Sequence, residues 1–363
     1  MARQAVRRAL GAVLTLGALA ALGACGGSFG DGSLVSSVRV LSVRNTPASG
    51  SPGAPVRLEL LAVDGSLPPG KRRPLQVAWL GGCHDPSGGH FFSCYPVLHE
   101  IAQGFDERVI DSPVSRFPPG VFLGLTMAEG AEPPHFDFTM PSDILSKSPR
   151  VPTEPVHAGV SYVFFAVCAG ELYPRLDLTD RVPLGCRDPV SHADFGTRGF
   201  VTGFTTVYTY DGFENHTPIL KDVQFGQMSM SLPCTADADC AGPSDGAFTA
   251  KCGPSSLCIP ELKPCTAKSC PKFALTPLVD ASSAEALPGE SGTEVIWANF
   301  YTTAGAFRSP SQLVNDRNTG FLKDYSTDFK APGTAVGLVD LWVTVNDQRG
   351  GDTWQSLQVL VDE

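Results

Sequence analysis

Apolar and polar residues alternate along much of this chain, in short runs separated by turn-forming residues. Val56, Leu58 and Leu60 would point to one side of an extended chain, and Arg57 and Glu59 to the other. This period of two predicts β-strands with one buried face, because successive side chains of a strand point to opposite faces of a sheet. Such strands are predicted at residues 38–43, 56–62, 75–79, 162–168, 201–210, 295–297, 339–345 and 357–361.

The composition favours an all-β protein rich in loops. The 363 residues include 38 Gly and 31 Pro, and this abundance of turn formers indicates short strands joined by tight connections. Helix is expected only in patches, of which 142–147, with Ser142 as its N-cap, is one. A strand with one apolar face must bury it against a second sheet, so the expected architecture is an antiparallel β-sandwich.

The order of the predicted strands resembles a known class of domain. Two strands separated by a Pro/Gly-rich turn, the second ending near Asp64, are followed by a strand that carries Trp79, as in bacterial immunoglobulin-like (Ig-like) domains. The last strands, with the polar turn 346–352 between them, resemble those of PKD-type modules in surface lipoproteins. The resemblance implies two Ig-like antiparallel β-sandwiches with a small disulfide-rich loop insertion. The expected domains are 37–213, with long loop insertions, and 214–363, which contains a cysteine-rich segment at 231–272.

The N-terminal segment has the features of a secretory signal. Arg3, Arg7 and Arg8 precede a charge-free apolar run that ends at Leu22-Gly23-Ala24-Cys25. Because a cysteine follows the small residues, this motif resembles the lipobox of bacterial lipoproteins. The resemblance implies a signal peptide over 1–24, a lipidated flexible tether over 25–36, and attachment of acyl chains such as palmitate at Cys25.

An ordinary transmembrane helix is the alternative for the same stretch. The charge-free run is shorter than the ~20 residues that span a bilayer, which favours the lipoprotein interpretation. Gly26 follows the cysteine at the position where Asp retains many Gram-negative lipoproteins in the inner membrane. By analogy, we expect attachment to the outer membrane of the cell envelope, facing the periplasm or the cell surface.

The charge balance excludes one class of partner. The chain has 27 Lys and Arg against 37 Asp and Glu, a formal net charge of −10. Removal of residues 1–24, which contain three Arg and no acid, leaves a charge of −13. A nucleic-acid partner requires a basic footprint, so none is expected. Contact with the membrane is expected through the lipid anchor.

Eleven cysteines minus the lipidated one leave ten, an even number in an exported chain. Disulfides are expected in that compartment, and the absence of any Cys-x-x-Cys pair argues against zinc. Cys83 is expected to pair with either Cys94 or Cys168, and the sequence leaves this choice open. The expected disulfide cysteines are Cys83, Cys94, Cys168, Cys186, Cys234, Cys240, Cys252, Cys258, Cys265 and Cys270.

Two patterns resemble parts of enzymes. Ser244 lies in a Gly-x-Ser-x-Gly sequence, but no predicted strand precedes it, as a nucleophile elbow requires. His84, Asp85, His90 and His99 have the side chains of a metal site without the spacing that places two ligands on one helix face. We therefore expect no catalytic residue and no metal ligand, and solvated loop histidines are the interpretation preferred.

Acidic turns raise the question of calcium. Asp237 and Asp239 lie close together, and the turn from Asp347 to Asp352 is also acidic. Carboxylate oxygens bind calcium in some extracellular β-modules, but Asp also stabilises turns by itself. No cofactor is expected, and calcium at the Asp347 turn is kept as the alternative.

Three tryptophans of the second half are candidates for a sugar-stacking surface. Trp297 shares a predicted strand face with Val295, which favours a place in the core. Trp354 follows the polar turn and is the better candidate for an exposed aromatic residue, while Trp342 lies within a predicted strand.

These features favour a membrane-anchored, non-enzymatic lipoprotein of the cell envelope. Its role would be structural, or display and binding of a protein or glycan through its Ig-like domains. One alternative is a metal-dependent or hydrolytic envelope enzyme that uses the histidines of the first domain. Another is an accessory subunit of a surface complex.

Overall fold

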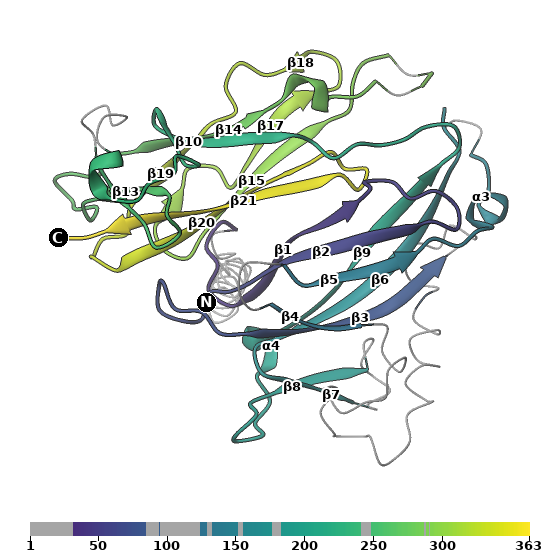
Figure 1. Ribbon diagram of the computed structural model, residues 1–363, viewed down its shortest axis with the longest axis horizontal. Helices are drawn as coiled ribbons and strands as arrows, with labels where there is room; N and C mark the ends of the chain where they lie inside the picture. Colours follow the sequence, from purple (N-terminus) through teal and green to yellow (C-terminus); the bar gives the residue numbers. More distant parts are fainter. Residues whose placement is uncertain are drawn as a thin grey trace, which may run out of the picture. The chain divides into compact units, whose positions relative to one another are not determined.

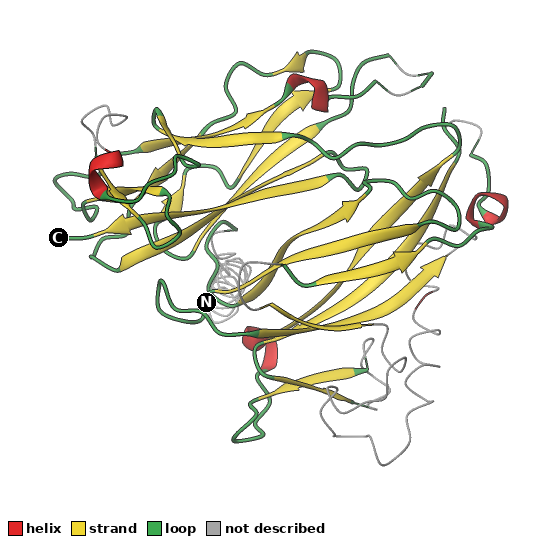
Figure 2. Cartoon of the chain, viewed as in Figure 1, coloured by secondary structure: helices red, strands yellow, loops and turns green. Residues whose placement is uncertain are grey.

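A computed structural model describes residues 32–84, 94, 124–128, 133–151, 155–175, 183–240, 248–286, 288–289 and 291–363. Almost all regular structure in this part of the chain is β-strand, and the described helices are at most four residues long (Figure 2). The predicted all-β class with antiparallel sheets is therefore confirmed. Residues 33–363 form one compact unit. None of the described helices has the length and hydrophobicity that a membrane crossing requires.

The strands of the first half form a three-stranded sheet, a four-stranded sheet and a two-stranded hairpin, all antiparallel (Figure 1). Two single-turn helices connect strands of this half: one follows β5 in the sequence, and the other follows β8. In spatial order, the sheets are β1 (Val38–Thr46), β2 (Pro55–Asp64), β5 (His135–Thr139); and β4 (Gly124–Ala128), β3 (Leu75–His84), β6 (Ala158–Cys168), β9 (Phe200–Tyr210); the hairpin is β7 (Glu171–Pro174), β8 (Leu184–Arg187), and the helices are α3 (Ile144–Lys147) and α4 (Gly196–Gly199).

The two larger sheets of this half enclose one hydrophobic core. Val56, Leu58 and Leu60 of β2 are fully buried, as their alternation predicts, and face apolar residues of β3 and β6. Trp79 of β3 is also fully buried and stacks on Phe136 at a centroid distance of 5.7 Å. The core between the sheets makes this half a β-sandwich.

The second half forms a sandwich of a five-stranded and a seven-stranded sheet (Figure 1). Its pairs are antiparallel except for β13 with β21, which run parallel. In spatial order, the sheets are β11 (Met228–Ser229), β10 (Leu220–Phe225), β14 (Phe273–Val279), β19 (Thr327–Lys330), β16 (Ala306–Phe307); and β12 (Thr249–Cys252), β13 (Cys258–Leu262), β21 (Asp352–Val361), β20 (Gly337–Asn346), β15 (Ile296–Thr302), β17 (Ser311–Asp316), β18 (Gly320–Phe321); the 3-10 helices are η3 (Asp237–Cys240) and η4 (Ala281–Ser283).

The cysteine-rich segment joins the second sandwich. It contributes β12 and β13 to the seven-stranded sheet, and Cys234, Cys240 and Cys258 are buried in the core of that half. The sandwich therefore supplies the core that this polar segment lacks. The structure has the disulfides Cys83–Cys94, Cys168–Cys186, Cys234–Cys252, Cys240–Cys258 and Cys265–Cys270.

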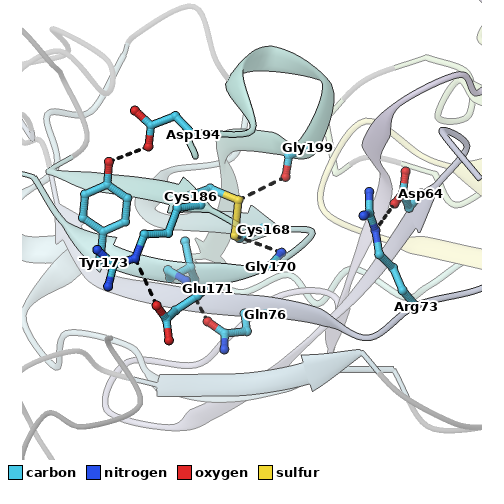
Figure 3. The surroundings of a disulfide bond; sticks show 12 residues. Asp64, Arg73, Gln76, Cys168, Gly170, Glu171, Tyr173, Cys186, Asp194 and Gly199 are labelled. Atoms are coloured by element: carbon cyan, nitrogen blue, oxygen red, sulfur yellow. Dashed lines mark hydrogen bonds and ion pairs between the residues drawn. A yellow bond between two sulfur atoms is a disulfide. The ribbon is translucent and has the colours of Figure 1, made fainter. Parts of the chain in front are cut away.

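One disulfide attaches the β7–β8 hairpin to the sandwich of the first half. Cys168 ends β6 and is bonded to Cys186 of β8 (Figure 3). On the other strand of the hairpin, the backbone N–H of Leu172 donates to Oε1 of Gln76 in β3 at 2.8 Å. The hairpin is therefore held to both β6 and β3.

The strand predicted at 38–43 contains a break in its alternation. Val40 pairs with Ala62, and Ser42 pairs with Leu61, so Leu41 is an extra residue in a β-bulge. Val38 and Val40 pack against the core before the bulge, and Val43 does so after it. Leu41 and Ser42 are thereby turned toward the second half of the chain.

The expected cap of the helix at 142–147 is wrong. Helix α3 begins at Ile144, and its N-cap is Asp143, whose side chain makes no capping hydrogen bond. The Asp143 carboxylate instead pairs with Lys147 at 2.6 Å, one turn along the helix. The side chain of Asp143 thus stabilises the helix through an ion pair and not through a cap.

Replacing Trp79 by Ala is expected to lower the free energy of unfolding by about 3–5 kcal/mol, because it leaves a cavity between the sheets. Urea unfolding measures this value. The matched control is Val190→Ala, since the Val190 side chain is 87% exposed. Its effect is expected to stay within about 0.5 kcal/mol. Equal effects of the two changes would contradict the position of Trp79 in the core.

Candidate functional site

The outer face of β1 lies against the outer face of β20 and β21. Leu41 and Trp342 are buried together in a small apolar cluster that also contains Val35. The guanidinium of Arg44 lies 4.5 Å from the ring centroid of Trp354 in β21. A cation above an aromatic face adds an electrostatic attraction to this apolar contact.

Polar groups continue the same contact at the β20–β21 turn. The hydroxyl of Ser42 donates to Asp352 at 3.0 Å, and Asn215 donates through Nδ2 to Asp347 at 2.7 Å. Gly350 has a φ of 102° and approaches the carbonyl of Ala48 so closely that a Cβ there would lie 3.0 Å from its oxygen. A glycine is therefore favoured at this turn position, by both its backbone and its neighbours.

The carboxylate of Asp347 is used by the turn itself. Its Oδ1 accepts the backbone N–H groups of Arg349 at 2.7 Å and Gly351 at 2.9 Å, and its Oδ2 accepts the bond from Asn215. Both oxygens therefore have donors from within the protein. This arrangement favours turn stabilisation over calcium binding as the reason for an acidic residue here.

The other acidic pair has a similar role. Asp237 accepts the backbone N–H of Cys252 at 2.9 Å, and Asp239 accepts those of Thr235 and Ala236. The three bonds that Asp239 receives from Thr235 and Ala236 lower the pKa of its carboxyl group. Both side chains thus support the cysteine-rich segment.

Buried carboxyl groups surround the β20–β21 turn. Glu294 has no exposed surface, and burial raises its pKa to about 8, with the nearby Asp347 acting in the same direction. The guanidinium of Arg349 lies 3.2 Å from this carboxyl group and only partly opposes the effect of burial. Burial likewise raises the pKa of Asp352 to about 7 and that of Asp347 above its ordinary value. The turn region therefore holds two carboxyl groups whose raised pKa values lie near neutral pH.

A cavity of about 420 Å³, which we call the junction groove, lies beside this contact. The loop between β2 and β3 forms one wall, and the outer face of β20 and β21 forms another. Gly70, with a φ of 74°, brings the loop against Leu338 of β20. The volume is in the range of ligand sites. Its lining includes Leu61, Pro68, Arg72, Asp340, Trp342 and Trp354.

Ion pairs hold the loop across the junction groove. Arg72 donates to Oδ1 of Asp340 at 2.9 Å, and Gln358 donates to the same oxygen at 2.9 Å. Arg73 donates to Asp64 at 2.6 Å and so fixes the base of the loop (Figure 3). The junction groove therefore combines apolar walls, a buried carboxylate and exposed basic groups.

The three candidate tryptophans occupy different environments. Trp342 is 5% exposed and lines the junction groove, and Trp354 is half-buried beside it. The expectation that Trp297 lies in the core is wrong, because Ile296 and Ala298 occupy the core face of β15. Trp297 is half-buried on the opposite face, together with Val295. The structure thus brings two of the three residues together at the junction groove.

The residues of the two enzyme-like patterns do not form a site within the described part of the chain. Asp85, His90, His99 and Ser244 lie outside the described residues, as does Cys25. Nδ1 of His84 lies 3.2 Å from the carbonyl oxygen of Val160. Among the described residues, one cysteine cluster comes close enough together to hold a metal ion, and all its members are disulfide-bonded: Cys234, Cys240 and Cys258.

Several residues of this region were missed by the analysis of the sequence. Arg72 belongs to the run Lys71-Arg72-Arg73, which stands out in an acidic chain and is a usable signal. Asp340 lies within β20 and Glu294 just before β15, at positions that carry no local mark of burial. Their proximity to partners distant in sequence depends on the sheet topology.

Comparisons with known proteins add little. No protein-family model matches the sequence, and no curated protein matches it. Among solved structures, the chain is similar to dimeric latent PorU from Porphyromonas gingivalis, with 9% sequence identity and a TM-score of 0.19. The match covers 90% of this chain but only 24% of that one. A likeness this weak carries no argument.

Stability is expected to fall as the pH rises from about 5 to about 8. The raised pKa values mean that the folded protein retains protons on Glu294 and Asp352 that the unfolded chain releases above about pH 4. Each group lowers the free energy of unfolding by up to about 1.4 kcal/mol per pH unit in this range. Urea unfolding at a series of pH values measures the slope.

Glu294→Gln and Asp352→Asn are each expected to flatten this slope, because neither amide titrates. Glu214→Gln is the matched control, since Glu214 is exposed. A slope that is unchanged in Glu294→Gln, or equally changed in Glu214→Gln, would show that the buried carboxyl groups do not cause it.

Calcium is expected to leave the stability unchanged. Both oxygens of Asp347 already accept bonds from N–H groups, so an ion would have to break the turn in order to bind. Melting temperatures in EDTA and in millimolar calcium should therefore agree. A rise in calcium that Asp347→Asn abolishes would contradict this interpretation.

Proposed function

We propose that this chain is a lipid-anchored, non-enzymatic binding protein of the bacterial cell envelope, attached to the outer membrane through Cys25. Two Ig-like β-sandwiches carry the binding surface, and the junction groove is its central part. In this proposal, residues 1–24 are the signal peptide and residues 25–36 the tether.

The observation that carries the proposal is that every cysteine except Cys25 is paired in a disulfide. The chain has eleven cysteines, and ten of them form the five disulfides. Cys25 is the remaining one, and it is the cysteine that follows Leu22, Gly23 and Ala24 in the lipobox-like motif. Disulfides form and persist in oxidising compartments, which fits export of the chain. Several acyl chains, at ~0.8 kcal/mol per buried methylene, would hold an exported protein firmly to a membrane.

The site geometry supports binding more than catalysis. The junction groove is bounded by strands of two disulfide-bonded sandwiches and by a loop fixed through two arginine–carboxylate pairs. A site that is rigid before its ligand arrives loses less entropy on binding. Asp340 in the lining accepts hydrogen bonds from both Arg72 and Gln358, and these bonds hold it as a fixed acceptor.

Replacing Cys25 by Ser is expected to abolish acylation, because the hydroxyl of Ser lacks the nucleophilicity of a thiolate. Mass spectrometry of wild-type protein from a Gram-negative host should find acyl groups on an N-terminal Cys25. The Cys25→Ser form should lack them and retain residues 1–24. Ser28→Ala is the matched control and should be processed like the wild type. Processing and membrane retention of Cys25→Ser at wild-type levels would overturn the proposal.

A further inference from the structure

We propose that the junction groove binds an anionic saccharide, with Lys71 and Arg72 facing its carboxylate groups and Asp340 accepting bonds from its hydroxyl groups. This inference rests on the proposed binding function and names the ligand class. Four features of the junction groove support it: its charge, its free acceptor, its apolar wall and the position of the surrounding strands.

The charge of the rim is opposite to that of the chain. Lys71, Arg72 and Arg73 form a run of three basic residues in a protein with a net charge of −10. Arg73 is neutralised by Asp64, whose side chain is only 2% exposed. The side chain of Lys71 is exposed and makes no ion pair within the described part of the chain, and that of Arg72 is 67% exposed. Lys71 is therefore available to an anion, and Arg72, which donates through one nitrogen to Asp340, has further N–H donors in its exposed guanidinium group.

The buried carboxylate of Asp340, which lies in the lining of the junction groove, has one oxygen without a donor among the described residues. Asp340 is 4% exposed, and Arg72 and Gln358 both donate to its Oδ1. No described residue donates to Oδ2. A carboxylate accepts through both oxygens, so Oδ2 is available to a hydroxyl group. Ser356, which also lines the junction groove, adds a further hydroxyl partner.

The aromatic residues supply an apolar wall for the C–H surface of a sugar ring. Trp354 is half-buried and is held in place by Arg44, and Trp342 lies beside it. Indole rings combine a large apolar area with little conformational freedom, which suits them to binding surfaces. A cavity of about 420 Å³ is large enough to enclose a short segment of a polysaccharide.

The strand pairing disfavours an extended peptide as the ligand. Peptides that bind β-proteins in extended form commonly add a strand to a free sheet edge. The junction groove instead lies over β20 and β21, which are interior strands of the seven-stranded sheet. β20 pairs with β15 and β21, and β21 pairs with β13 and β20. Recognition at this place must therefore come from side chains.

The test is calorimetric titration of the full-length protein in detergent with trigalacturonate and with its fully methyl-esterified form. Both probes have the same sugar rings, but the ester carries no charge. We expect the acid form to bind, to bind less tightly as salt increases, and to bind at least about tenfold more tightly than the ester.

Lys71→Gln combined with Arg72→Gln is expected to weaken binding of trigalacturonate by about tenfold or more. Lys71→Gln alone tests whether a cation at the rim contributes to binding, and it leaves the ion pair of Arg72 with Asp340 intact. This single change should also weaken binding of trigalacturonate. The matched control is Arg308→Gln, because Arg308 is 77% exposed and pairs with Asp328 in the opposite sheet of the second sandwich. This control should bind like the wild type.

Equal binding of the acid and the ester, or unchanged binding in Lys71→Gln and in the double variant, would overturn the inference. Binding of hexaglutamate in place of trigalacturonate would overturn the assignment to a saccharide. The acylation of Cys25 is measured separately. Failure of saccharide binding in an acylated protein therefore rejects the ligand class alone, whereas absence of acylation rejects the anchored function.

Discussion

The structure depends on the contact between β1 and the β20–β21 hairpin. An extra residue at Leu41 changes which side of β1 faces the core, so Leu41 and Ser42 both reach the second half of the chain. Leu41 then packs with Trp342, and Ser42 donates to Asp352. A strand with strict alternation would turn one of these two side chains into the core of its own sandwich. The bulge thus allows β1 to pack against the core of the first half and also against the apolar cluster that contains Trp342.

Two features of the molecule lie beside this contact. It adjoins the β20–β21 turn, where burial raises the pKa of Glu294 and of Asp352 because charged carboxylates lose their hydration there. It also places the β2–β3 loop over the face of β20, where Arg72 meets Asp340 and closes the junction groove. The buried carboxyl groups and the candidate binding site therefore lie on either side of the same contact.

Much of the fold could be predicted because its signals are local. The alternation of Val56, Leu58 and Leu60 and the polar turn at 346–352 depend only on neighbours in sequence, and the structure has both. The face of Trp297 was mispredicted because a three-residue segment cannot fix the side on which a strand meets its core. Local patterns also do not reveal the bulge at Leu41, since its effect depends on pairing with β2.

The candidate site was only partly accessible from the sequence. Trp342 and Trp354 are two of the three tryptophans that the sequence offered for a sugar-stacking surface, and the structure places both at the junction groove. Arg72 and Asp340 are 268 residues apart in the chain, and nothing local relates them. Contacts of this kind follow from topology, which alternation and turns do not determine.

A double-mutant cycle on Leu41→Ala and Trp342→Ala tests the central claim most directly. Urea unfolding of the wild type, both single variants and the double variant gives the coupling between the two sides of the contact. If β1 and the β20–β21 hairpin hold the halves together, the two changes should couple by about 1 kcal/mol or more. Additive effects within about 0.3 kcal/mol would show that the halves do not support each other through this contact.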